Sequence, residues 1–95
     1  MFRLGLKGLA MRLITLVKVV PGRMNEGFER LRTLPTQKMP EGVRTCLSWV
    51  TYGSYDLVWA WEAPDMRTAN QVLQEATKDG LFTTETMAAQ DSAEF

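Results

Sequence analysis

Residues 43–65 alternate apolar side chains with small or polar ones, and this pattern predicts two β-strands joined by a tight turn. Gly53 and Ser54 separate two runs that are rich in Val, Trp, Tyr and Thr. Glycine in the first of two loop positions suits a type II′ turn, which would pair Tyr52 with Tyr55. The turn then sets the register of the whole hairpin.

This register divides the side chains of the hairpin between two faces of a sheet. The expected pairs are Val50–Leu57, Ser48–Trp59 and Cys46–Trp61 on one face, and Trp49–Val58, Leu47–Ala60 and Thr45–Glu62 on the other. We expect the face with Trp59 to pack against helices, because Glu62 lies on the other face, and a carboxylate on the helix-facing side would be buried without a partner. The face with Trp49 should then point to a partner sheet.

A strand and a helix are predicted ahead of the hairpin. Residues 12–20 are apolar toward both sides, as is typical of a strand that is covered on both faces. Met24, Phe28 and Leu31 then recur at helical spacing. This helix should end near Leu34, because the following proline disfavours helical backbone in the residue before it.

A helix and a strand are predicted after the hairpin. Pro64 cannot donate to a strand ladder and Asp65 is a good N-cap, so the second hairpin strand should stop where a helix starts. The apolar stripe of this helix consists of Met66, Ala69, Val72, Leu73 and Ala76. Gly80 suits its C-terminal end, and the Thr-rich residues 82–89 predict a final strand.

The predicted order is strand, helix, strand, strand, helix, strand. We therefore expect an α+β fold, a ferredoxin-like βαββαβ sandwich with a four-stranded antiparallel sheet and both helices on one face. The chain of 95 residues is long enough for one small domain. We assign residues 11–90 to this domain, residues 1–10 to a flexible N-terminal extension and residues 91–95 to a frayed C-terminus.

The face of the sheet opposite the helices must also be shielded from solvent. It would expose more apolar surface than a soluble monomer usually tolerates, and two helices cover only the other face. We expect a homodimer in which two such sheets pack face to face. The expected interface residues are Ile14, Leu16, Leu47, Trp49, Val58 and Ala60.

Charge and composition narrow the possible partners. Residues 1–44 hold nine Lys or Arg against three Glu, and residues 45–95 hold two against eight Asp or Glu. The basic residues are scattered, so we interpret the +6 and −6 halves as complementary parts of a chain or dimer and expect no nucleic acid. No apolar run approaches a membrane span, so we expect no membrane partner and a cytoplasmic location.

The residue inventory excludes several chemistries. The sequence contains no histidine, which removes imidazole-activated nucleophiles and the usual His-bearing metal and haem sites. Cys46, the single cysteine, should be a small buried hydrophobe opposite Trp61. We assign no catalytic residue, no metal ligand and no cofactor.

The sequence YGSYDLVWAWEAPD, followed by a helix and TTETM, resembles the GYD domain family. It is more distantly similar to the ligand-binding domain of the leucine-responsive regulators. Both belong to the dimeric α/β-barrel group, and the resemblance covers about residues 12–90. Its most specific residues are Gly53, Tyr55, Asp56 and the end of the second strand at residues 62–65, with Ser54 standing between Gly53 and Tyr55. The regulators carry a DNA-binding helix-turn-helix ahead of this domain, for which we expect no room here.

Two function classes remain. The first is a non-enzymatic dimeric module that binds a small metabolite or a protein partner, as the regulator resemblance implies. The alternative is a cofactor-free monooxygenase or isomerase that acts in the barrel cavity and needs a proton-moving group there. Candidate ligand contacts are Tyr52, Gly53, Tyr55 and Asp56 at the hairpin.

Several polar and aromatic side chains could have either a functional or a purely structural role. Asp56 either binds a ligand amine or accepts backbone donors of the hairpin. Trp49, Trp59 and Trp61 line an aromatic pocket or simply pack in the core and interface. Arg44 and Glu85 lie on strands that border the barrel cavity, where a solvated or paired charge is the default.

Overall fold

The computed structural model describes residues 10–34 and 37–95. The elements in chain order are β1 (Met11–Val19), α1 (Met24–Thr33), β2 (Arg44–Val50), β3 (Leu57–Ala63), α2 (Met66–Thr77), β4 (Phe82–Ala88) and a short 3-10 helix (Ser92–Glu94). This confirms the predicted ferredoxin-like order. Residues 1–9 of the predicted extension lie outside the described residues. In the described part of the chain, no helix is long and apolar enough to span a membrane.

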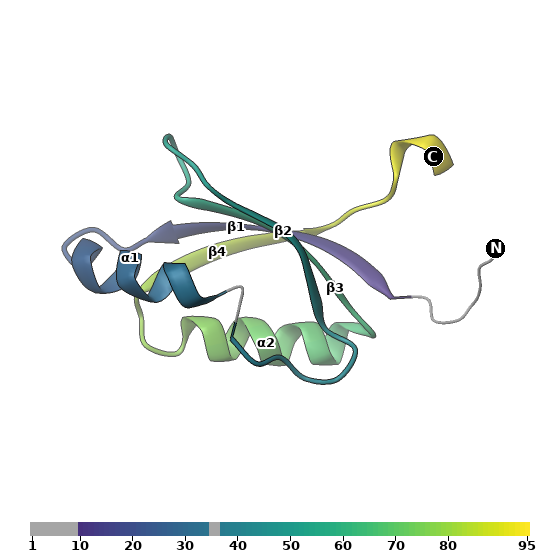
Figure 1. Ribbon diagram of the computed structural model, residues 1–95, viewed down its shortest axis with the longest axis horizontal. Coiled ribbons are helices and arrows are strands. Elements are labelled where there is room, and N and C mark those ends of the chain that lie inside the picture. The colour runs from purple at the N-terminus through teal and green to yellow at the C-terminus, as the bar shows by residue number, and fades with distance from the viewer. Residues whose placement is uncertain (1–9, 35–36) are drawn as a thin grey trace.

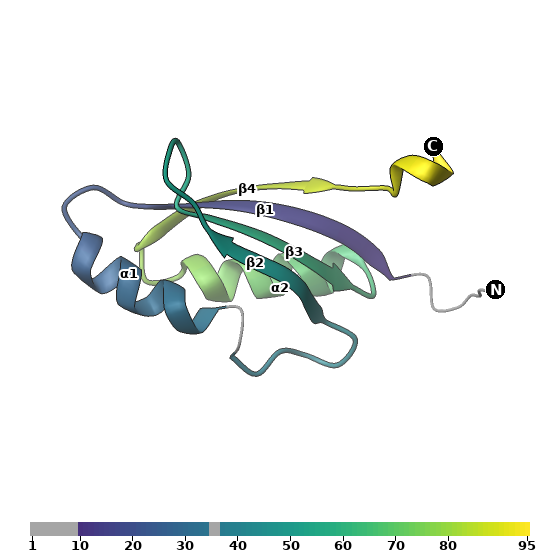
Figure 2. The ribbon, with the colours of Figure 1, turned by 45° about the horizontal axis from the view of Figure 1, so that its top comes forward.

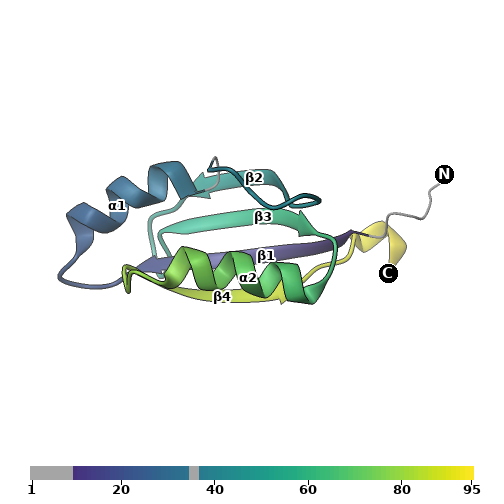
Figure 3. The ribbon, with the colours of Figure 1, turned by 90° about the horizontal axis from the view of Figure 1, so that it is seen from below.

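The four strands form one antiparallel sheet in the order β2-β3-β1-β4. Both helices lie on the same side of this sheet (Figure 1). Seen from the helix side, α2 lies in front of β1 and β4 (Figure 3). Within the described residues, no helix or strand covers the opposite side, which we call the open face.

The core lies between the sheet and the helices. Leu57, Trp59 and Trp61 are buried there, which confirms the predicted helix-facing side of β3. The rings of Trp59 and Trp61 stack with centroids 4.5 Å apart. Leu13 and Val17 from β1 complete the sheet side of this core.

Threonine hydroxyl groups accept hydrogen bonds from the indole N–H groups of both tryptophans. Trp61 Nε1 donates to Thr15 Oγ1 at 2.8 Å, and Trp59 Nε1 donates to Thr45 Oγ1 at 2.9 Å. Thr15 Oγ1 also shares a hydrogen bond of 2.8 Å with Thr86 Oγ1. These bonds remove the cost of burying two indole N–H groups without partners.

The two helices form where they were predicted, and a cap and two glycines at or near them have clear structural roles. Asp65 caps α2, because its Oδ1 accepts from the backbone N–H of Thr68 at 2.8 Å, and this bond lowers the pKa of the Asp65 carboxyl group. Gly80 has a positive φ of 72° just beyond α2. Gly27 is buried in α1, and its missing side chain allows the helix to approach Val19 on β1.

The predicted two-residue turn is wrong. The strands of the hairpin end at Val50 and resume at Leu57, so residues 51–56 form a longer loop, which we call the hairpin loop. Gly53 does not have the positive φ that the type II′ turn requires. Tyr52 and Tyr55 do not pair; Thr51 N instead donates to Asp56 O at 3.0 Å.

A β-bulge at Cys46 corrects a second prediction. The pairs nearest the hairpin loop are those expected, from Val50–Leu57 to Leu47–Ala60. Beyond them Thr45 pairs with Trp61, and Arg44 takes the predicted place of Thr45 opposite Glu62. Cys46 is the unpaired extra residue and is exposed, so it is not the buried partner of Trp61.

Candidate functional site

The open face of the sheet carries two rows of side chains that run across its strands and are apolar except for Glu85 on β4. Strand register places Leu47, Ala60, Ile14 and Met87 in one row and Trp49, Val58, Leu16 and Glu85 in the next. Figure 2 looks onto this face, with the strands in the order β4, β1, β3 and β2 and with α2 behind them. Leu47 is 52% exposed and Trp49 is 61% exposed, although both are large apolar side chains. All six predicted interface residues therefore lie on the open face.

One end of the open face is charged. Arg44, Glu62 and Arg12 form a third row, in which Glu62 Oε1 accepts from Arg44 Nη2 at 2.9 Å and Glu62 Oε2 lies 3.7 Å from Arg12 Nη2. We call this the arginine row. The hydrogen bond to Glu62 raises the pKa of Arg44. Two guanidinium groups thus share one carboxylate, which leaves one positive charge in excess.

The other end of the open face is formed by the hairpin loop. Tyr55 Oη donates to Glu85 Oε1 at 2.6 Å, which joins the loop to β4 across β1. The carboxylate stabilises the protonated phenol and so raises the pKa of Tyr55. Lys18 Nζ donates to the carbonyl oxygen of Ser54 at 3.3 Å.

Asp56 connects the hairpin loop to the end of β1. Its Oδ2 accepts from the backbone N–H of Val19 at 2.8 Å, and its own N–H donates to Val17 O at 2.8 Å. The carboxylate therefore accepts a backbone donor, although from β1 and not from the hairpin itself as one interpretation expected. Sequence reasoning had no local signal for this contact, since 37 positions separate the two residues.

The predicted ligand contacts do not converge on one point. Tyr52 is 97% exposed at the tip of the loop, and Gly53 has no atom within 4 Å of the place a Cβ would take. Tyr55 and Asp56 instead point to β4 and β1. Sequence reasoning missed the arginine row, because the bulge that aligns Arg44 with Glu62 has no signature in the sequence.

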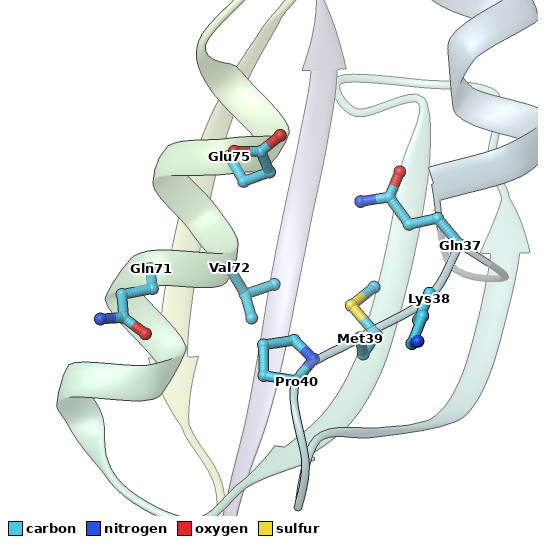
Figure 4. A pocket seen from close by; sticks show the side chains of 7 residues that line it. All are labelled: Gln37, Lys38, Met39, Pro40, Gln71, Val72 and Glu75. Atoms are coloured by element: carbon cyan, nitrogen blue, oxygen red, sulfur yellow. The ribbon is translucent and has the colours of Figure 1, made fainter.

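A hollow lies on the helix side of the sheet. It has a volume of about 590 Å³ and lies between α2 and residues 37–40. Figure 4 shows the apolar side chains of Met39, Pro40 and Val72 at this hollow, with Gln37 and Glu75 on its upper edge. Within the described residues, no group of three or more His, Cys, Asp and Glu side chains could hold a metal ion.

Solved structures with this fold include MtbAldR and a regulatory protein. MtbAldR aligns with a TM-score of 0.70 at 7% identity, and a feast or famine regulatory protein from M. tuberculosis complexed with L-methionine aligns with 0.61 at 12%. Each alignment covers 86% of this chain but only 52% and 51% of those proteins, so this chain spans about half their length. These likenesses show a shared fold.

FFRP-DM1 is more similar in sequence, at 26% identity with a TM-score of 0.57, over 84% of this chain and 99% of its own. No curated protein matches this sequence. Residues 20–95 match the GYD domain, a region that contains the hairpin, both helices and β4. Since this match spans most of the chain and includes Gly53, Tyr55 and Asp56, the protein belongs to the GYD domain family.

Proposed function

We propose that this protein is a cytoplasmic homodimer that binds a small metabolite or a protein partner without catalysing a reaction. The observation that supports this most strongly is the uncovered pair of apolar rows on the open face. Trp49 and Leu47 stand more than half exposed there, beside Val58 and Ile14. Apolar patches of this kind on soluble proteins mark interaction sites.

The distribution of charge on the open face supports a second copy as the partner. The apolar rows lie in the middle, with the arginine row at one end and Lys18 and Glu85 at the other. An apolar centre with a charged rim is the usual anatomy of a protein interface. The chain carries no net charge, so two copies approach without overall repulsion.

The hairpin loop is the proposed place of ligand capture. Tyr52 offers a fully exposed aromatic ring, and Gly53 leaves the adjacent backbone accessible. Tyr55 and Asp56 hold the loop in place, and each keeps polar atoms at the rim of the open face. The structure of a feast or famine protein with L-methionine supports a small molecule as ligand for this fold.

One observation favours the alternative of a cofactor-free monooxygenase or isomerase. Tyr55 and Glu85 form a hydrogen-bonded pair at the edge of an apolar surface, where a proton could be exchanged with a substrate. The phenol is protonated at neutral pH and the carboxylate raises its pKa further, so Tyr55 would serve as the proton donor and Glu85 as the proton acceptor.

Sedimentation and native mass spectrometry test the proposal together. We expect a dimer at micromolar concentration, together with a retained small molecule in protein purified from its own cells. Trp49→Asp should give monomers, because a charge would be buried in the interface twice. Met24→Asp is the matched control, since Met24 is a similarly exposed apolar residue on α1. A monomeric wild type, or a dimeric Trp49→Asp variant, would refute the dimer.

A further inference from the structure

The residues after β4 extend away from the sheet. Ala89 N donates to the carbonyl oxygen of Arg12 at 2.9 Å, which is the last hydrogen bond that joins this end of the described chain to another strand. Residues 90–95, which we call the arm, are all exposed. Figure 1 shows the arm beyond the end of the sheet, on the side away from α1 and α2. The described part of its own chain therefore leaves the arm unburied.

The arm has a defined local structure. Asp91 Oδ1 accepts from the backbone N–H of Ala93 at 2.9 Å, and Glu94 N donates to Asp91 O at 2.9 Å. These bonds form the short 3-10 helix Ser92–Glu94. Phe95 follows it with a fully exposed aromatic ring. An ordered segment that presents an aromatic side chain to solvent suits contact with a partner protein.

The arm continues from the border of the open face. Met87 lies in the apolar row beside Ile14, and it is exposed. The chain passes from Met87 through the end of β4 directly into the arm. A second copy that covers this row would therefore lie next to the arm.

The two ends of the open face differ in charge. The arginine row holds two guanidinium groups and one carboxylate, a net charge of +1. At the end with the hairpin loop, Lys18 stands against the carboxylates of Asp56 and Glu85, a net charge of −1. The arm carries Asp91 and Glu94 and no Lys or Arg. Charge complementarity therefore favours the arginine end of a second copy as the neighbour of the arm.

We propose that the arm of each copy lies on the second copy of this chain, beside Arg44 at the start of its β2. The two-fold axis then runs along the strands, so that β4 of one copy faces β2 of the other and the two arginine ends meet. Asp91 and Glu94 offset the repulsion between the two arginine rows. This inference rests on the homodimer proposed above and deepens it, because it fixes the orientation of the two copies.

The single cysteine makes this orientation testable by cross-linking of the full chain. Cys46 is exposed on β2, two positions from Arg44. In the variant Ser92→Cys, oxidation with copper phenanthroline should join the introduced thiol to Cys46 of the second copy and give a covalent dimer. The bond cannot form within one chain, since β2 and β4 are opposite edge strands about 14 Å apart, whereas bridged Cα atoms lie within about 7 Å.

The double variant Ser92→Cys/Cys46→Ser is the control for the identity of the bond. It keeps the introduced thiol and lacks the proposed partner, so we expect no covalent dimer. An equal yield of covalent dimer in this control would show that the arms contact each other and would overturn the proposal.

Ser54→Cys tests the opposite orientation of the two copies. Ser54 is also an exposed serine, but it lies on the hairpin loop at the other end of the open face. If the two-fold axis ran across the strands, the hairpin loop of one copy would lie over the start of β2 of the other. We expect no cross-link to Cys46 from this position. A cross-link from Ser54→Cys and none from Ser92→Cys would refute the proposed orientation.

Removing the charges of the arm should weaken the dimer. We expect Asp91→Asn/Glu94→Gln to raise the dissociation constant of the dimer about fivefold or more, because each lost charge pair occurs twice in a two-fold dimer. The difference from the wild type should shrink as salt rises. Glu26→Gln/Glu29→Gln is the matched control, since it removes two exposed carboxylates of α1 on the helix side of the sheet. The same dissociation constant in the arm variant as in this control would count against the contact.

Sedimentation of the same samples separates this inference from the homodimer itself. A dimeric wild type, combined with no cross-link from Ser92→Cys and no effect of the arm charges, would reject the arm contact and leave the homodimer in place. A wild type that is monomeric at micromolar concentration would refute the homodimer and the arm contact together.

Discussion

The carboxylate of Asp56 accepts a hydrogen bond from the backbone N–H of Val19 at 2.8 Å, so the loop between β2 and β3 is fastened to the end of β1. Asp56→Ala would leave this N–H without its acceptor. We expect the free energy of unfolding to fall by about 1–3 kcal/mol, as for other bonds to charged groups. Urea denaturation measures the change. Asp56→Asn is the control, because its amide oxygen still accepts; an equal loss in both variants would show that the negative charge matters more than the bond.

The Tyr55–Glu85 hydrogen bond predicts a pH dependence at alkaline pH. The Tyr55 pKa is raised in the folded state above its ordinary value near 10, so the bond stabilises the fold fully below that value and ceases to do so as the pH rises through the folded pKa. In a Tyr52→Phe background, the absorbance of the remaining tyrosinate should appear above the ordinary range. Glu85→Gln should bring the titration back toward it. A titration of Tyr55 that is the same in both variants would contradict the contact.

Gly27 tests the packing of α1 on the sheet. A Cβ at this position would overlap Cγ1 of the buried Val19, although alanine favours helix over glycine by about 1 kcal/mol. Overpacking typically costs about 1–3 kcal/mol, so we expect Gly27→Ala to lower stability on balance. Gly53→Ala is the control, since nothing lies within 4 Å of its Cβ position and its φ is not positive. Thermal unfolding compares the two variants, and a Gly27→Ala protein that is more stable than the wild type would refute the close approach.

The buried hydroxyl of Thr15 predicts an effect on the tryptophan pair. Thr15→Val keeps the shape of the side chain but removes the acceptor of Trp61 Nε1 and the partner of the Thr86 hydroxyl. We expect a loss of about 1–3 kcal/mol, because a buried indole N–H would be left unsatisfied. Chemical denaturation followed by tryptophan fluorescence measures it. Thr83→Val, on the exposed part of β4, should change stability little, and a similar loss there would argue against the buried bond as the cause.

Local patterns in the sequence account for the order of the elements and for the two faces of the sheet. The apolar periods of α2 and β1, the cap at Asp65 and the alternation of residues 57–61 are local signals, and each element follows them because burial and capping act within a few residues. The expected hairpin pairs, Ser48 with Trp59 and Trp49 with Val58, also place Trp59 on the buried face and Trp49 on the exposed one.

The contacts between distant strands follow from the way the strands pair in the folded chain. The bulge at Cys46 moved Arg44 beside Glu62, and the strand order brought Arg12 to the same carboxylate from β1. In the same way, Tyr55 of the hairpin loop forms a hydrogen bond with Glu85 on β4. Such pairings depend on the register between strands that are far apart in the chain. One inserted bulge residue changes this register, and no local sequence pattern reveals the bulge.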